Sequence, residues 1–276
     1  MSDPILRVLN LGAGVQSSTL ALMIKHGEIE NPPTHAIFAD TGWEPPEVYH
    51  WLLWLERVGL PFPVHRVKAI PPRSIHSNLK LDALASIKGT RFASMPLFTE
   101  SNGGCGQLKR QCTANYKIEP IEKFIRSQLL RVMRVGKDVT VEQLFGISAD
   151  EIYRVKESRV PWVKRRWPLV FEKRMTRQDC LRWMEDYCYP RPPRSSCIGC
   201  PYHSDAEWKR MRDECPADWQ EAIDFDRAIR KGVRGSREKC FLHSSLRPLA
   251  EVDLRSDEDC GQLLLFTDEC EGMCGT

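Results

Sequence analysis

The sequence predicts an α/β fold: a doubly wound parallel sheet followed by a C-terminal cysteine-bearing segment. Three observations predict this class. Short apolar runs typical of buried strands recur over the first 150 residues, helical spacing of apolar residues follows them, and turns of small or polar residues join the two. Strands that alternate with helices form parallel sheets, which bind ligands at the carboxyl ends of their strands.

The first two units carry the clearest pattern. ILRVLNL (5–11) predicts a strand, GAGVQSS (12–18) a tight turn, and STLALMIKHG (18–27) a helix. HAIFADTG (35–42) predicts the second strand and its turn, and a helix starts at Pro45 and Pro46.

The next segments complete the expected sheet of five strands. PVHRVKAI (63–70) and VTVEQLFGIS (139–148) predict the third and fourth strands, and Ile121 and Ile125 belong to an amphipathic helix over 114–133. Residues 71–111 are rich in Pro, Ser, Asn and Gly and predict a long excursion, mobile over the site.

The character of the chain changes after Glu151. Residues 154–177 contain nine lysines or arginines and two glutamates, then come a helix over 176–187, a C-x-x-C loop, a helix with Trp208 and Trp219, and an acidic tail. We therefore expect two regions, an α/β domain over 1–150 and a C-terminal basic, metal-binding region over 151–276 that packs on the strand ends.

Composition limits the class of protein. Eleven cysteines in a chain of 276 residues, without an apolar leader after Met1, favour a reducing cytoplasm over a disulfide framework. No apolar stretch is long enough for a membrane helix, so a soluble protein is expected. The net charge of +3 is too small to indicate nucleic acid by itself.

The first turn has the composition of an anion site. Backbone N–H groups at a helix N-terminus attract phosphate, glycines allow close approach, and hydroxyls add donors. An ordinary connection remains equally compatible with such a turn. The candidate phosphate ligands are Gly12, Ala13, Gly14, Val15, Gln16, Ser17 and Ser18.

Several motifs in order resemble the phosphoadenosine phosphosulfate reductase-like branch of the adenine nucleotide alpha hydrolase (PP-loop) superfamily. The turn resembles its SGGxDS[ST] loop, with Gly12, Ala13 and Gln16 replacing the usual residues. FADTGWEPPEVY, CTANYKIEPI, FGISADEIYR, WPLV and RSSCIGCP resemble its later segments, although Ser148 stands where arginine is commoner.

The resemblance implies a Rossmann-like fold of the adenine nucleotide alpha hydrolase type, with ATP or a related adenine nucleotide and Mg²⁺ as cofactors. Phosphates would lie on the first turn and the adenosine near Asp40, Thr41 and Gly42. Lys117 and Arg154, in the matching segments, are the basic candidates for catalysis.

The C-x-x-C of Cys197 and Cys200 is compatible with zinc, a redox pair or an iron–sulfur site. In the resembling iron–sulfur members an upstream cysteine completes the site, and Cys112 occupies that place. Three thiolates would leave one iron of a [4Fe–4S] cluster open for sulfur. Structural zinc, with Cys105 as fourth ligand, is the alternative.

The acidic tail contains Cys270 and Cys274, in a place where resembling reductases carry a nucleophilic cysteine; a structural role on a terminal helix has equal weight. In the basic stretch, arginines alternate with Trp162 and Trp167, a pairing that binds phosphates and stacks bases, although the tryptophans could equally pack in a core.

Three functions follow as hypotheses. The first is ATP-dependent adenylation and sulfur transfer to a nucleic acid, tRNA or DNA; the second is thiol-dependent sulfonucleotide reduction; the third is a nucleotide-binding regulatory protein with structural zinc. A sulfur or electron donor protein and a second copy of the chain are the expected protein partners.

Overall fold

The structure is a computed structural model and describes residues 6–101, 104–133, 139–236 and 238–255. A parallel sheet of five strands confirms the predicted α/β class. Its order, β3-β2-β1-β6-β7, builds outward from β1 in both directions. The strands are β1 (Leu6–Asn10), β2 (His35–Asp40), β3 (Val64–Lys68), β6 (Val141–Phe145) and β7 (Val163–Arg166).

The fifth strand comes from the basic stretch. β7 is an edge strand, and its side chains divide between the two faces of the sheet. Arg166 forms two short contacts with Glu172, at 2.7 and 2.9 Å, and an ion pair with Glu142 at 3.5 Å. The sheet therefore extends beyond residue 150, where the boundary between the two regions was expected.

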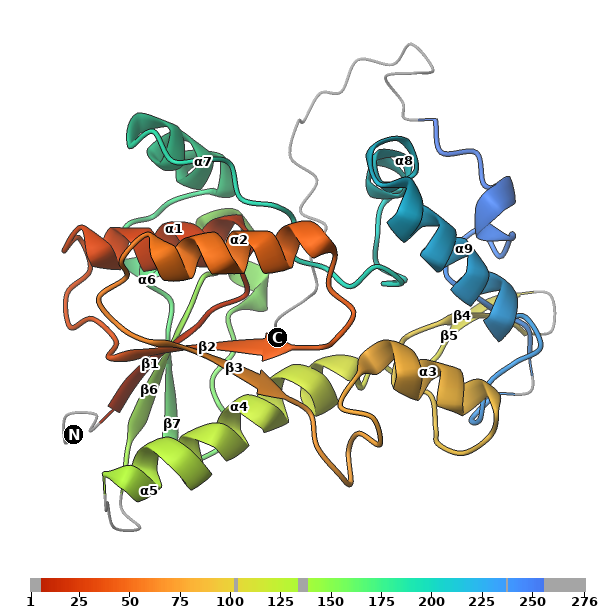
Figure 1. The fold of residues 1–276 in the computed structure, drawn as a ribbon, viewed down its shortest axis with the longest axis horizontal. Helices are drawn as coiled ribbons and strands as arrows, with labels where there is room; N and C mark the ends of the chain where they lie inside the picture. Colours follow the sequence, from red (N-terminus) through yellow and green to blue (C-terminus); the bar gives the residue numbers. More distant parts are fainter. Residues whose placement is uncertain (1–5, 102–103, 134–138, 237, 256–276) are drawn as a thin grey trace.

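Four helices of the described chain lie on one side of the sheet, and the last of them packs on the first rather than on the strands (Figure 1). They bury a core that includes Leu9, Leu22, Leu52 and Cys180. The helices are α1 (Val15–Lys25), α2 (Pro46–Arg57), α6 (Pro168–Phe171) and α7 (Arg177–Asp186).

A single long helix covers the opposite face, as the periodicity predicts (Figure 1). Ile121, Ile125 and Leu129 lie on its buried side and pack against Val8 and Val141. Its hydrogen bonding alternates between π and α turns, through η1 (Ala114–Ile118), α4 (Glu119–Phe124), η2 (Ile125–Leu129) and α5 (Leu130–Val132).

The excursion expected over 71–111 is corrected by the structure, because it contains regular elements. A three-stranded antiparallel sheet has the order β5-β4-β8, so its pairing joins this segment to a strand near the end of the described chain. Local composition does not reveal such a distant partner. The elements are α3 (Leu79–Ile87), β4 (Phe98–Ser101), β5 (Gly104–Gln107) and β8 (Cys240–Phe241).

This small sheet belongs to a second core with the C-terminal helices. Leu97, Trp208 and Phe225 are buried in it together with Cys197 of the C-x-x-C loop. The helix expected around Trp208 and Trp219 is two helices, because a new one starts at Pro216. The remaining elements are η3 (Ala149–Arg154), α8 (Asp205–Glu214), α9 (Pro216–Ile229) and η4 (Leu249–Glu251).

Candidate functional site

A cavity of about 200 Å³ lies at the carboxyl ends of β1 and β6, between the sheet and the helix that starts at Ala114. Its walls come from the turn after β1, the first turns of that helix, and loops that follow β6 and α7. The lining includes Asn10, Gly12, Gly14, Val15, Gln16, Ser17, Ile37, Thr113, Lys117, Ile118, Ile121, Gln143, Phe145, Gly146, Glu151, Arg154, Arg165, Arg177, Arg194 and Ser195.

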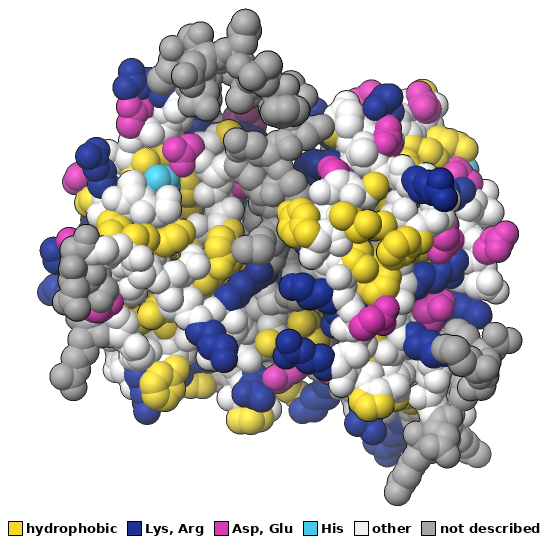
Figure 2. All heavy atoms as spheres, turned by 180° about the vertical axis from the view of Figure 1, so that it is seen from behind, with side chains coloured by type: hydrophobic (Ala, Val, Ile, Leu, Met, Phe, Trp, Pro, Cys, Tyr) yellow, Lys and Arg dark blue, Asp and Glu magenta, His cyan; other side chains and the backbone are white. Residues whose placement is uncertain are grey.

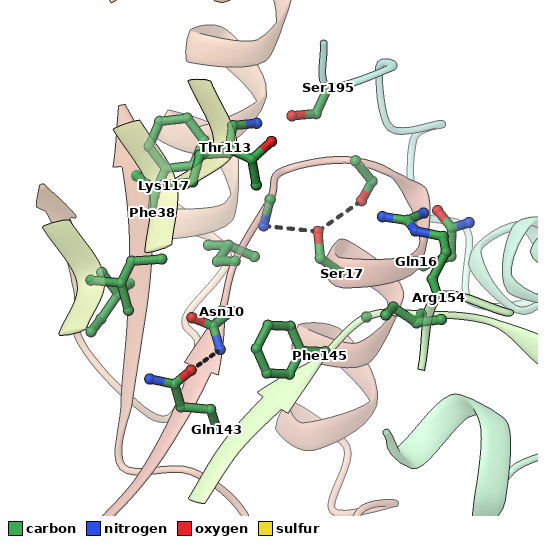
Figure 3. A pocket seen from close by; sticks show the side chains of 18 of the residues that line it. Asn10, Gln16, Ser17, Phe38, Thr113, Lys117, Gln143, Phe145, Arg154 and Ser195 are labelled. Atoms are coloured by element: carbon green, nitrogen blue, oxygen red, sulfur yellow. Dashed lines mark hydrogen bonds between the residues drawn. The ribbon is translucent and has the colours of Figure 1, made fainter. Parts of the chain in front are cut away.

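The turn after β1 forms one wall of the cavity (Figure 3). The Ser17 hydroxyl accepts from the Gly12 N–H at 3.2 Å and donates to the Gly14 carbonyl at 3.3 Å, so it ties the two ends of the turn together. Val15 begins α1 directly after it. The N-terminal end of an eleven-residue helix therefore lies at the cavity wall, where its dipole favours an anion.

Gly146 explains how the turn approaches β6 so closely. A Cβ atom at this position would lie 2.5 Å from Ser17 Cα and 2.6 Å from Ser17 N, both backbone atoms that cannot move independently. Every other residue type would push the turn away from the strand. The glycine in FGIS is therefore a requirement of the site.

Some predicted ligands lie outside the cavity lining. Ala13 is fully buried, and Ser18 is fully buried and accepts from Trp51 Nε1 at 2.8 Å. Asp40 accepts from the Gly42 N–H and the Tyr49 hydroxyl, both at 2.8 Å, which stabilises the turn after β2. The strand residues before this turn line the cavity instead.

Two predicted basic residues, Lys117 and Arg154, are at the cavity. Lys117 Nζ lies 3.7 Å from Glu44, and Arg154 forms an ion pair with Glu151 at 2.7 Å. Figure 3 places the Arg154 side chain beside Gln16, at the end of the turn.

Three further arginines, Arg165, Arg177 and Arg194, line the same cavity. Arg177 donates to Gln16 Oε1 at 3.2 Å. Burial lowers the pKa of Arg177, and Arg194 nearby lowers it further. Burial also lowers the pKa of Arg165, whose Nε has no hydrogen-bond partner in the described part of the chain. Desolvated cations that repel each other favour an anionic ligand.

The rest of the basic stretch divides between packing and surface. Trp167 is buried with Ile147 and Val170, and Trp162 packs against the core under the long helix. The packing interpretation of these two tryptophans is therefore confirmed. Figure 2 shows Lys and Arg side chains gathered across the middle of the rear face, between the two halves of the molecule.

Polar side chains also lie at the floor of the cavity, below the turn (Figure 3). Asn10 Nδ2 donates to Gln143 Oε1 at 3.4 Å and to the Leu144 carbonyl at 3.5 Å. Gln143 is 5% exposed, and its Nε2 has no hydrogen-bond partner among the described residues. The Phe145 ring lies beside Asn10 (Figure 3), and Ile121 lines the same cavity.

The lining offers little to a resident magnesium ion. Glu151 is the one acidic side chain among the described lining residues, and it is already ion-paired with Arg154. Magnesium usually takes one or two carboxylates together with substrate phosphates. The donor set therefore does not fit a magnesium site built by the protein, and the basic side chains carry the positive charge.

The predicted metal ligands are brought to one core without forming a metal group. Cys197 is buried in the second core, and Cys112 and Cys200 pack against it. Over the described ranges, no three His, Cys, Asp or Glu side chains are arranged to hold a metal ion. Cys105, the alternative ligand, is exposed and its Sγ lies 3.8 Å from the Ser244 carbonyl.

The C-x-x-C loop instead makes ordered contacts with the turn after β2. Cys197 Sγ lies 3.3 Å from Thr41 Oγ1, and the Ile198 N–H donates to the Trp43 carbonyl at 3.0 Å. A Cβ atom at Gly199 would lie 2.2 Å from the Trp43 ring, so the loop approaches this ring closely.

The two predicted tail nucleophiles, Cys270 and Cys274, lie outside the described residues.

Sequence reasoning missed several residues of the cavity. Arg177 is the last residue of the basic stretch and Arg194 lies beyond it, and no local pattern distinguishes either from a surface arginine. Asn10 and Gln143 carried a usable signal, because each is an uncharged polar residue in a strand expected to be buried.

Comparison with known proteins does not assign a family. No protein-family model matches the chain, and a search of curated proteins gives no significant match. None of the described helices is both long and apolar enough to cross a membrane.

Proposed function

We propose that this chain is an enzyme that binds an adenine nucleotide in the cavity and cleaves its phosphate chain. One observation carries the proposal: a helix N-terminus and five basic side chains surround a single cavity at the carboxyl ends of parallel strands. Phosphates would lie along residues 12–17, as the resemblance to PP-loop enzymes implies.

The proposed chemistry relies on charge stabilisation by the protein. When ATP is cleaved between its α- and β-phosphates, negative charge grows on the leaving pyrophosphate. Arg154, Arg177 and Arg194, together with the helix N-terminus, would stabilise that charge. Lys117, on the opposite wall, would orient the phosphate chain.

The reaction proposed for bound ATP begins with adenylation of a carbonyl oxygen on a nucleic-acid acceptor, tRNA or DNA, which releases pyrophosphate. Sulfide-level sulfur from the expected donor protein then displaces AMP, which leaves with the oxygen that it activated. The basic side chains on the rear face in Figure 2 favour a polyanionic acceptor. Cys112, Cys197 and Cys200 form no metal group among the described residues, so these thiols are given no role in the proposed steps.

Sulfonucleotide reduction is the second candidate, and the composition of the cavity favours it. Its basic lining without a free carboxylate suits a highly anionic nucleotide that needs no metal ion. The nucleophile expected for this reaction, Cys270 or Cys274, lies outside the described residues.

The deciding experiment offers both substrates to the purified full-length protein. ATP is incubated with and without tRNA or DNA, and pyrophosphate is measured; phosphoadenosine phosphosulfate is incubated with thioredoxin, and sulfite is measured. Pyrophosphate that depends on nucleic acid supports the first candidate, and sulfite supports the second. Neither product, with no nucleotide binding in calorimetry, would overturn the proposal.

Matched arginine variants test the role of the cavity. Arg154→Leu removes a lining cation and should lower the rate about 10²- to 10³-fold. Arg182→Leu removes an exposed arginine on α7, whose ion pair with Asp179 lies outside the lining, and should retain the rate. The predicted cluster is tested separately, by measuring the iron and zinc content of protein purified without oxygen.

A further inference from the structure

The floor of the cavity contains an amide pair that the phosphate-binding role does not use. Gln143 and Asn10 lie on the neighbouring strands β6 and β1 and point into the same space below the turn (Figure 3). Gln143 is two residues before Phe145, so it lies roughly 7 Å deeper along the strand. A group bound there is well separated from phosphates on residues 12–17.

The hydrogen bonds of this pair fix the orientation of both amides. The Leu144 carbonyl can only accept, so Asn10 must direct its Nδ2 toward it, at 3.5 Å. The same Nδ2 donates to Gln143 Oε1 at 3.4 Å. Two atoms remain for a ligand, Asn10 Oδ1 as an acceptor and Gln143 Nε2 as a donor.

The Gln143 donor is buried and without a partner in the described residues, which is costly unless a ligand satisfies it. A second buried donor, Arg165 Nε, lies on β7 at the position paired with Gln143. Two buried donors without hydrogen-bond partners in the described residues lie on adjacent strands at one cavity. This arrangement indicates that a ligand accepts their hydrogen bonds.

The walls beside the amide pair are apolar. Ile37 of β2, Ile118 and Ile121 of the long helix, and Phe145 of β6 all line the cavity. Such walls suit a flat aromatic ring, whereas phosphates would be placed among the cations near Gln16. The floor is therefore suited to a nucleobase.

We infer that Asn10 and Gln143 recognise the base of the bound nucleotide and select adenine; the inference rests on the proposed nucleotide-binding function. The 6-amino group of adenine donates to Asn10 Oδ1, and the adjacent ring nitrogen accepts from Gln143 Nε2. Hypoxanthine and guanine present a carbonyl oxygen where adenine has its amino group. That oxygen meets the Asn10 acceptor and is rejected.

Calorimetric binding of ATP and ITP to the full-length protein tests the inference. ITP replaces the 6-amino group by a carbonyl oxygen, so the wild type should bind ATP at least about tenfold more tightly. Gln143→Leu removes the donor with little change of volume, and should weaken ATP binding about 5- to 150-fold. It should also reduce the ratio of the affinity for ATP to the affinity for ITP.

Gln220→Leu is the matched control, since Gln220 lies on α9 and donates to the neighbouring Asp224 side chain. It should bind both nucleotides as the wild type does. Equal wild-type affinities for ATP and ITP, or unchanged ATP affinity in a folded Gln143→Leu protein, would overturn the inference and leave the proposed function standing. Failure of the wild type to bind either nucleotide would overturn both. If Gln143→Leu does not fold, the ratio of the wild-type affinities for ATP and ITP decides whether the inference holds.

Discussion

At the scale of single residues, Arg177 combines a cost to the fold with a benefit to binding. Its guanidinium is desolvated beside Arg194, and both effects lower its pKa. Replacing it should therefore cost the ligand-free protein little, because the repulsion disappears together with the hydrogen bond to Gln16. The same replacement should weaken binding of every anionic ligand.

Arg177→Leu is expected to keep the ligand-free melting temperature within about 2 °C of the wild type or raise it, and to weaken ATP binding about tenfold. Thermal unfolding without ligand and calorimetry with ATP measure the two effects. Arg182→Leu on the same helix is the control for both. A large loss of stability with unchanged affinity would show that Arg177 serves the fold.

Asp82 is a residue whose charge serves the fold. Burial alone would raise its pKa, but hydrogen bonds from Ser74, Tyr116 and His76 and the charge of Arg91 outweigh burial and lower the pKa below its usual value. Arg91 Nη1 lies 2.6 Å from the carboxylate. This cluster attaches the segment around α3 to the long helix.

Asp82→Asn should lower the free energy of unfolding by about 3–5 kcal/mol at pH 7, because it leaves the Arg91 charge without its partner. A lowered folded pKa contributes stability that is complete above the unfolded value and is lost as the pH falls through the folded value. The difference between wild type and variant should thus be constant near neutrality and shrink below about pH 4. Urea unfolding at several pH values measures it, and a difference that persists unchanged in acid would contradict the assignment.

At the scale of elements, the junction of β6 with the first turn depends on a close backbone approach at Gly146. Gly146→Ala should push the turn out of place, because the added methyl group meets Ser17 backbone atoms at 2.5 and 2.6 Å. The expected cost is about 1–3 kcal/mol of unfolding free energy, with weaker nucleotide binding. Gly14→Ala is the control for stability, since its methyl group would lie 3.5 Å from Ser195 Cβ, an ordinary contact. Equal stability of the two variants in urea would refute this role of Gly146.

Elements with a strong local pattern were predictable from the sequence. The four apolar strands and the helix over 114–133 have periodicities that local residues determine, and the structure confirms them. The fifth strand has charges on both faces, because Arg165 lies at the cavity and Arg166 pairs with Glu142 and Glu172. A strand with charged side chains on both faces lacks the apolar pattern by which strands are recognised.

The site was predictable to a similar extent. The turn at 12–18 was located by its glycines and its position between strand and helix, and five of its seven residues line the cavity. Arg177 and Arg194 could not be assigned, since only the path of the chain after β7 brings them to β1. The order of the strands and the path of the chain, not a local sequence pattern, bring these arginines together at the cavity.

At the scale of the whole molecule, the turn after β2 and the C-x-x-C loop connect the second core with the cavity. Trp43, which follows β2, is buried in the second core beside Cys197 and Ile198 of the C-x-x-C loop. Arg194 and Ser195, directly before that loop, line the cavity. The second core therefore positions a wall of the cavity, and ligand binding in the cavity should be coupled to the stability of the entire fold.

That coupling gives a prediction for a ligand smaller than any substrate. We expect pyrophosphate to bind the native cavity and to find no comparable site in the unfolded chain, so at a hundred times its Kd it should add about 2.7 kcal/mol of stability. For a chain of this size the melting temperature should rise by about 5 to 10 °C. Differential scanning fluorimetry measures the shift, with potassium chloride at the same ionic strength as the control. Arg154→Leu should reduce the shift, because it removes a cation from the cavity lining. An equal shift from chloride, or an undiminished shift in that variant, would place the anion elsewhere on the molecule.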